Sequence, residues 1–170
     1  MKLVTAIDYY DALLRMLPLA KQRIVIHSMT ILWGSRTEKI LPLLHDALAR
    51  GIEVRIVGDL YSKFYANTPK IIRHDDSFKW AHTRAVNIKL EAEGAHITYV
   101  GKLGFNPFKN RTHSKVTIID NAVFTFGGVN FQGSAFANRD YMLRIDDPTL
   151  SDDLYNLVRD IEKNNVKTDM

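Results

Sequence analysis

Hydrophobic and polar positions along this chain follow two periods, one typical of helices and one of strands. Between Thr37 and Arg50, apolar residues recur every three or four positions, which predicts an amphipathic helix that Gly51 ends. The short apolar runs Gln22–Leu32 and Ile52–Val57 flank this helix and are typical of buried strands. This order predicts a βαβ unit whose two strands are parallel.

Two Thr-x-x-Asp sequences, Thr5 to Asp8 and Thr149 to Asp152, have the spacing of a helix capping box. They predict a first helix over residues 5–20 and a last helix over residues 149–163. The remaining predicted elements are a helix over Phe78–Glu93 that ends at Gly94, and strands over Ala95–Val100, Ser114–Ile119, Ala122–Phe126 and Tyr141–Ile145.

Helices and strands therefore alternate, which predicts an α/β fold in a single domain over residues 1–170. We expect an α/β/α sandwich with a mixed, mostly parallel central sheet. Two long segments lack either period. Asp59–Ser77 is rich in aromatic residues and is interpreted as a functional loop or lid, and Gly101–Thr112 is a basic loop.

Composition narrows the possible functions. The chain of 170 residues is 46% hydrophobic and 25% charged, which is typical of a globular protein. Its net charge of +4 favours anionic partners such as nucleic acid or lipid phosphate. The absence of cysteine excludes disulfides, zinc sites built on thiolates and cysteine catalysis. No apolar run is long enough to span a bilayer, so we expect a soluble protein whose membrane contact, if any, is peripheral. The sequence does not indicate a compartment.

One run of residues carries candidate chemistry. His113 and Lys115 lie two apart on a predicted strand, which would place both side chains on one face. Gly127 and Gly128 end the partner strand, where glycine permits close approach of a ligand to the backbone. Asn130 adds an amide donor. Together these groups can converge on one phosphate-like oxyanion.

The motif His-x-Lys-x4-Asp-x6-Gly-Gly-x-Asn over residues 113–130 resembles the signature of the phospholipase D superfamily, the HKD phosphodiesterases. Residues 21–59 resemble the first strand–helix–strand of cardiolipin-synthase-like members. The loop over residues 105–113 and the strand over residues 139–145 resemble the segments on either side of the motif in those proteins. The resemblance therefore covers most of the chain.

The resemblance implies a role for each motif residue. His113 would attack phosphorus and form a phosphohistidine intermediate. Asp140 would orient His113 by accepting its other ring N–H, although a surface ion pair with Arg139 or Arg144 is the alternative. Asp120 belongs to the catalytic motif, yet we expect it to hold the hairpin. The residues expected to bind the substrate are Lys115, Gly127, Gly128, Asn130 and Arg111. For Arg111, the alternative is a side chain that contacts only solvent. No metal and no other cofactor are implied.

The motif occurs once in the sequence, whereas the resemblance implies an active site with two motifs, one histidine attacking and the other protonating the leaving oxygen. A homodimer would supply the second motif, or else the chain is half of a two-motif enzyme. The favoured function is a phospholipase-D-type phosphodiesterase or phosphatidyltransferase acting on phospholipids, in the manner of cardiolipin synthases. The alternatives are a homodimeric, metal-independent endonuclease and an inactive anion-binding half-domain.

Other histidines carry less signal. His27 follows an apolar run and is interpreted as a histidine of the core or its rim with a hydrogen-bond partner. The sequence His74-Asp75-Asp76 is interpreted as loop charge rather than as a metal site.

Overall fold

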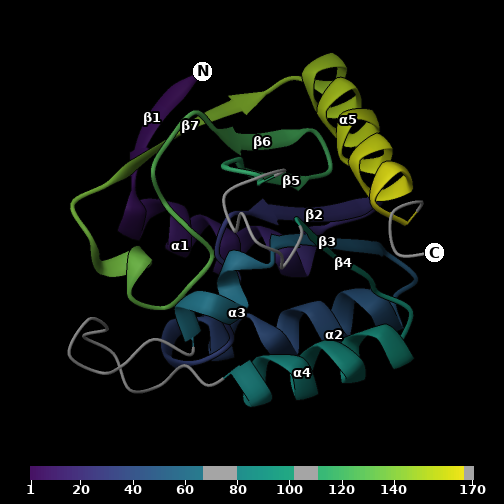
Figure 1. Ribbon diagram of the computed structural model, residues 1–170. Helices are drawn as coiled ribbons and strands as arrows, with labels where there is room; N and C mark the ends of the chain where they lie inside the picture. Colours follow the sequence, from purple (N-terminus) through teal and green to yellow (C-terminus); the bar gives the residue numbers. More distant parts are fainter. Residues whose placement is uncertain (67–79, 102–110, 167–170) are drawn as a thin grey trace.

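The computed structural model describes residues 1–66, 80–101 and 111–166. Over these residues the chain forms a mixed seven-stranded sheet with helices on both faces (Figure 1). The order across the sheet is β1-β7-β6-β5-β2-β3-β4. Its strands are β1 (Lys2–Thr5), β2 (Arg23–Ser28), β3 (Glu53–Asp59), β4 (His96–Val100), β5 (Lys115–Ile119), β6 (Ala122–Thr125) and β7 (Tyr141–Asp146). The predicted α/β sandwich with a mixed sheet is confirmed.

The expectation that this sheet is mostly parallel is wrong. Within the described chain, parallel pairing joins β2 to β3 and β3 to β4, whereas the pairs β2–β5, β5–β6, β6–β7 and β7–β1 are antiparallel. The predicted βαβ unit forms the parallel part. The antiparallel part follows from the tight turn at Asp120–Asn121, because a two-residue connection reverses the chain direction. Sequence reasoning missed β1, which is a short edge strand.

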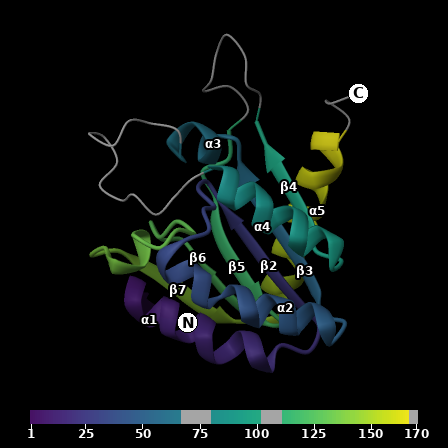
Figure 2. The ribbon, with the colours of Figure 1, turned by 90° about the horizontal axis from the view of Figure 1, so that it is seen from below.

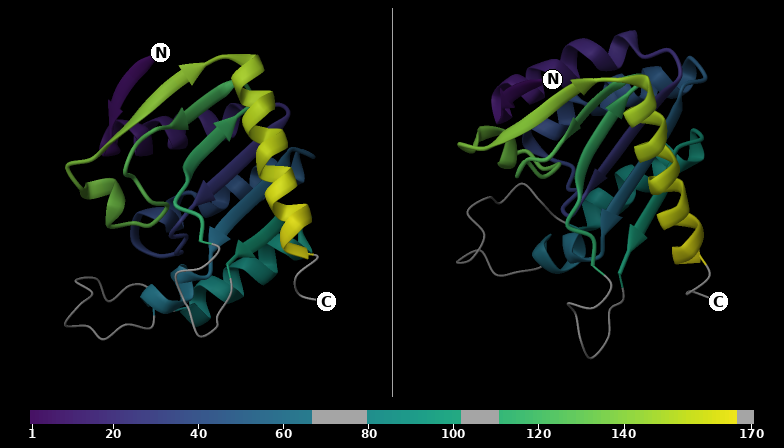
Figure 3. Two further views of the ribbon diagram at one scale, coloured as in Figure 1. Left: turned by 45° about the horizontal axis from the view of Figure 1, so that its top comes forward. Right: turned by 90° about the horizontal axis from the view of Figure 1, so that it is seen from above.

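The helices form two layers. They are α1 (Ala6–Met16), α2 (Leu41–Ala49), α3 (Tyr61–Ala66), α4 (Trp80–Ala92) and α5 (Pro148–Val166). Seen from below, α1, α2 and α4 lie against one face of the sheet (Figure 2). The helix α5 crosses the opposite face (Figure 3). The first three residues of the predicted helix over Thr37–Arg50 belong instead to a short 3₁₀ helix, Ser35–Lys39, and α2 begins at Leu41.

A hydrophobic core lies on each face of the sheet, because successive strand residues point to opposite sides. On β2, Ile24 and Ile26 face the layer of α1, α2 and α4, whereas Val25 faces α5. Residues of the first core include Tyr9, Leu13, Leu44, Val54, Ile56, Leu90, Phe124 and Met142. The second core comprises Val25, Val57, Val100, Val116, Ile118, Val123 and Val158, with Leu150, Leu154, Tyr155 and Ile161 packed against it.

Helix ends follow local sequence signals with one exception. The capping box between Thr5 and Asp8 forms as predicted. After α2, Gly51 has a φ of 79°, and the carbonyls of the last turn accept the N–H groups of Gly51 and Ile52. The second predicted box, over residues 149–152, is wrong: Asp147 caps α5 by accepting the N–H groups of the two residues that follow Pro148.

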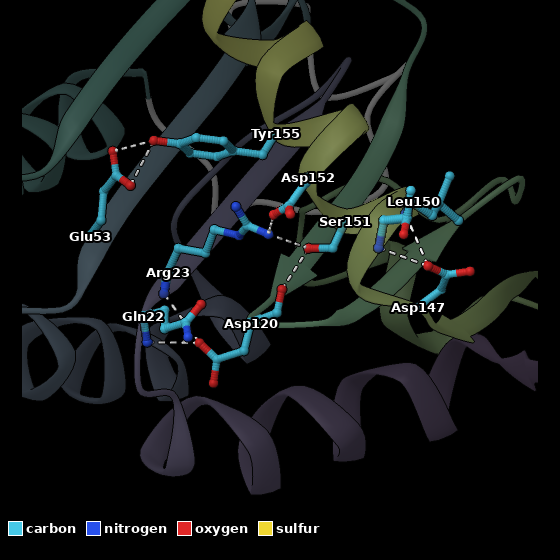
Figure 4. Close-up of polar contacts among 10 residues, drawn as sticks. Gln22, Arg23, Glu53, Asp120, Asp147, Leu150, Ser151, Asp152 and Tyr155 are labelled. Atoms are coloured by element: carbon cyan, nitrogen blue, oxygen red, sulfur yellow. Dashed lines mark hydrogen bonds and ion pairs between the residues drawn. The ribbon is translucent and has the colours of Figure 1, made fainter.

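Asp120 joins three parts of the fold (Figure 4). Its carboxylate accepts the backbone N–H groups of Lys21, Gln22 and Arg23 at 2.8–3.2 Å, at the point where β2 begins. Its own carbonyl accepts a hydrogen bond from Ser151 Oγ on α5 (2.6 Å). With a φ of 51°, Asp120 also occupies the left-handed region, which aspartate tolerates better than most residues. These contacts are those of a structural residue.

Replacement of Asp120 by alanine removes the acceptor of these three N–H groups. We expect Asp120→Ala to lower the free energy of unfolding by about 2 kcal/mol, as measured by urea denaturation. The control is Asp153→Ala, since Asp153 is exposed on α5 and should change stability little. Equal stability of the Asp120 and Asp153 variants would contradict the structural role of Asp120.

Candidate active site

The pairing of the strands brings His113, Lys115 and Asn130 of the motif to one edge of the sheet, the edge at which β2 and β3 end. Lys115, the first residue of β5, lies opposite Ser28, the last residue of β2, because these strands are antiparallel. The ends of β3 and β6 and the start of β7 reach the same edge. Consequently the segments before β5, after β6 and before β7 meet there, and they carry His113, Asn130 and Asp140.

His113 and Lys115 are adjacent at this edge. His113 is exposed and lies just before β5 rather than on it, so the two residues do not meet through strand alternation as predicted. Instead, Lys115 Nζ turns back, donates to the carbonyl oxygen of His113 (3.1 Å) and lies 3.4 Å from His113 Nδ1. Burial lowers the pKa of Lys115 from its ordinary value, and the negative charge of Asp140 opposes this shift.

Asn130 is held from β2. The single Ser28 hydroxyl proton has two acceptors within reach, the Thr30 carbonyl oxygen (3.0 Å) and Asn130 Oδ1 (3.3 Å), and Ser28 Oγ accepts the backbone N–H of Phe131 (3.1 Å). Ser28 is buried and lies opposite Lys115 in the sheet. It therefore fixes the start of the segment after the glycines in relation to Lys115. Ser28 was not identified from the sequence. A serine directly after an apolar run does indicate the point at which a buried strand ends.

The two glycines are required by close packing between β6 and β7. A Cβ atom on Gly127 would lie 1.9 Å from the carbonyl oxygen of Tyr141. On Gly128 it would lie 2.1 Å from a carboxylate oxygen of Asp140. The Gly128 N–H donates to the Tyr141 carbonyl (3.2 Å). The prediction that these glycines admit a ligand stays a prediction, and the structure supplies a packing reason for them.

The Asp140 carboxylate lies against Gly128, and its charge acts on Lys115. Its carboxylate accepts the backbone N–H of Tyr141 (2.8 Å), and no hydrogen bond joins it to His113 within the described part of the chain. The structure therefore does not contain the orienting contact expected from the resemblance. The alternative ion pair with Arg144 is also not formed, because Arg144 pairs with Asp146. Asp140 instead places a negative charge beside Lys115.

Arg111 is bound within the protein. Its guanidinium forms an ion pair with Asp59, a carboxylate that is fully buried at the end of β3. Asp59 also accepts the backbone N–H groups of Thr112 (2.8 Å) and Tyr61 (2.7 Å). A cavity of about 330 Å³ opens here, lined by Met29, Asp59, Tyr61, Arg111, Thr112 and His113. Arg111 therefore lines the cavity beside His113. The alternative expectation from the sequence, a side chain that only contacts solvent, is wrong, because Arg111 is paired with Asp59.

His27 is a core histidine, as predicted. It is 2% exposed, and its Nε2 lies 2.9 Å from Thr112 Oγ1, close enough for a hydrogen bond. Burial lowers the pKa of His27 to about 4, although the charge of Asp59 opposes the shift. His27 is therefore neutral at physiological pH and acts as an uncharged partner of Thr112.

Asp120 does not lie at this site. It follows the last residue of β5, whereas His113 precedes the first, so the length of the strand separates them. The structure thus brings together His113, Lys115, Asn130, Asp140 and Arg111, and places Asp120 at the opposite edge. Among residues 1–66, 80–101 and 111–166, no three His, Asp or Glu side chains are grouped so as to hold a metal ion. The sequence His74-Asp75-Asp76 lies outside the described residues.

Fold and site together define a phospholipase-D-like α/β domain. The model of the cardiolipin synthase PLD-like domain matches residues 13–161, and the chain belongs to this family. No curated protein matches. None of the helices in the described residues is both long enough and apolar enough to cross a membrane.

Solved structures share this fold. Nuc from Salmonella typhimurium, a phospholipase D family member, is 21% identical with a TM-score of 0.64, over 96% of this chain and 93% of that chain. NucT from Helicobacter pylori is 19% identical with a TM-score of 0.63, over 94% and 93%. Phosphatidylserine synthase from Haemophilus influenzae is 14% identical with a TM-score of 0.69, over 95% of this chain but 36% of that chain. At these identities the likeness concerns the fold.

The buried His27 predicts a pH dependence of stability. Because its pKa is about 4 in the folded protein and about 6.5 in the unfolded chain, only the unfolded state binds the proton between these values. The contribution of neutral His27 to the free energy of unfolding is thus fully present above about pH 6.5 and is lost as the pH falls toward about 4. Between pH 7 and pH 4, the free energy of unfolding measured by urea denaturation should fall by about 3 kcal/mol more in the wild type than in the His27→Gln variant. Parallel losses in both proteins would mean that His27 does not titrate in this way.

Proposed function

We propose that the protein is a phosphodiesterase or phosphatidyltransferase that acts on phospholipids through a phosphohistidine intermediate on His113. The observation that carries this proposal is the position of Lys115 Nζ 3.4 Å from the exposed ring of His113. A cation beside a nucleophile stabilises the charge that develops on phosphate oxygens during displacement. The match to the cardiolipin synthase domain supports phospholipid as the substrate class.

The reaction has two steps. A ring nitrogen of His113 attacks phosphorus, a P–N bond forms, and the P–O bond to the leaving alcohol breaks. That alcohol takes a proton from a general acid. An acceptor, either water or a lipid hydroxyl, then attacks phosphorus, loses its proton to the same group, and displaces His113. Lys115 and Asn130 bind the non-bridging oxygens throughout, and Asp140 limits the net charge beside Lys115.

The general acid is His113 of a second copy in this proposal. One chain contains one motif, and His113 is exposed at the sheet edge, where a two-fold axis can bring it opposite its mate. The same symmetry would place two Lys115 side chains around one phosphate. If the chain is instead part of a larger enzyme, a second domain supplies these groups.

Nucleic acid is the second candidate substrate. The observation that favours it is the net charge of +4, with a sequence pI of about 9.3, because cationic proteins bind the phosphate backbone and release counterions. The chemistry at His113 would be the same, with a nucleoside hydroxyl as the leaving group.

Loss of the nucleophile tests the chemistry. We expect the protein to hydrolyse bis(p-nitrophenyl) phosphate in the presence of EDTA, and His113→Ala to reduce the rate more than about 10³-fold. The control is His96→Ala, because His96 is exposed at the start of β4, at the other edge of the sheet. Activity that survives in the His113 variant excludes His113 as nucleophile, and an inert wild-type dimer favours the anion-binding half-domain.

A mixing experiment tests whether two copies share one site. Wild-type and His113→Ala chains are unfolded together in varied ratios and refolded. If each site needs two His113 side chains, mixed dimers are inactive and activity falls as the square of the wild-type fraction. A linear fall would show that each chain works alone.

The substrate class is separated by parallel assays on phospholipid vesicles and on single-stranded DNA. A phospholipid enzyme should release the lipid headgroup, or transfer the phosphatidyl group to an added alcohol. A nuclease should cleave the DNA and bind it with an affinity that falls steeply with salt. Cleavage of DNA without turnover of lipid would replace the first proposal by the second.

A further inference from the structure

Arg111 and Thr112, which lead directly to His113, are held at several points by buried groups. Thr112 donates its backbone N–H to Asp59, and its hydroxyl is bonded to His27. Arg111 forms its ion pair with the same Asp59. On the other side of His113, the carbonyl of Ser114 accepts the N–H of Met29 (3.1 Å). The backbone of His113 is therefore fixed from both sides while its ring stays exposed.

Asp59 is the group on which these contacts converge. It is 0% exposed, and its two carboxylate oxygens accept from Arg111, Thr112 and the backbone N–H of Tyr61. The Arg111 guanidinium also lies over the Tyr61 ring, 5.7 Å from its centre. One carboxylate at the end of β3 thus binds the segment before His113 and the start of α3 together. These residues line the cavity beside His113.

Stability alone is a weak reason for this arrangement. Removing a carboxylate and a guanidinium from water costs free energy that their attraction offsets only in part, so apolar residues at such a position are often as stable. A nucleophile, however, must be held within a fraction of an ångström of the attacking geometry, and a misplacement of about 1 Å can cost about 10²-fold in rate. The contacts of Asp59 with Arg111 and Thr112 restrain the segment before His113, which is the restraint that a nucleophile needs.

We infer that Asp59 is a positioning residue for His113, and that it acts through Arg111 and Thr112. Arg111 accordingly serves to hold the nucleophile segment, not to bind the substrate phosphate. This inference rests on the proposed role of His113 as nucleophile. Loss of Asp59 should therefore lower the rate of the first step and leave the affinity for substrate unchanged.

The test is Asp59→Asn, which keeps the size of the side chain. An amide offers one acceptor oxygen, so it cannot accept all three donors, and its NH₂ group opposes one of them. We expect kcat to fall about 10²-fold while KM changes less than about threefold. Arg111→Lys keeps the charge but loses the planar fork, and should lower kcat in the same direction.

A matched control separates positioning from destabilisation. Glu162 on α5 forms an ion pair with Arg55 of β3, and both are largely buried, like Asp59 and Arg111, but away from the site. Glu162→Gln should lower the melting temperature without lowering kcat per folded molecule. If Asp59→Asn does no more than this control, or if it raises KM and leaves kcat unchanged, the inference is overturned.

A second measurement does not depend on turnover. In protein with ¹⁵N-labelled histidine, the ring signals of His113 are identified by their loss in His113→Ala. Asp59→Asn and Arg111→Lys should shift or broaden these signals, whereas Glu162→Gln should not. Unchanged His113 signals in both variants overturn the inference even where the wild type is active. Shifted signals in a protein without phosphodiesterase activity retain the positioning role and reject the proposed function.

Where Asp59→Asn does not fold, Arg111→Lys alone decides between the two roles of Arg111. Positioning predicts a lower kcat with little change in KM and a shifted His113 signal. Direct binding of substrate predicts a raised KM with an unchanged signal, and this result would overturn the inference.

Discussion

The antiparallel register between β2 and β5 is the constraint on which the rest of the site depends. It sets Lys115 opposite Ser28, and the next pairing outward joins Ser114 to Met29. A slip of one residue would turn every β5 side chain to the other face and would move Val116 and Ile118 out of the core under α5. Burial on both faces of the sheet therefore holds the register, and the register brings the segment that carries His113, the proposed nucleophile, to the carboxyl end of β2.

The two ends of β5 have different tasks. At its start, the exposed side chain of His113 lies beside a cavity, as a reacting group would need. At its end, the Asp120 carboxylate is saturated by backbone N–H groups and ties the turn to β2, while its carbonyl ties it to α5. The motif residues thus divide between the proposed chemistry and the fold, although they lie within one short stretch of sequence. The site also rests on two buried polar groups outside the motif, Ser28 and Asp59.

Local signals predicted much of the fold. Capping at Thr5, the helix ends at Gly51 and Gly94, and the apolar run of β3 depend on neighbouring residues, and they were found where the sequence placed them. The strand predicted over Gln22–Leu32 is shorter, since β2 ends at Ser28. The direction of the strands was predicted less well, because pairing between distant segments is decided by which surfaces pack together. The short edge strand β1 carries almost no periodic signal. The start of α5 was misplaced because two residues, Asp147 and Thr149, could each serve as its cap.

The sequence by itself determined the family and the chemical groups of the site, since the spacing from His113 to Asn130 is a local property of the chain. It also favoured a structural role for Asp120, although Asp120 belongs to the catalytic motif. Only the tertiary structure decided the partners of Arg111 and of the glycines, because those contacts join separate segments of the chain. Asp59 and Arg111 are 52 positions apart in the sequence, and only the packing of the end of β3 against the segment before β5 brings them together. Burial then makes their pairing obligatory, since a charge without a partner in the interior is costly.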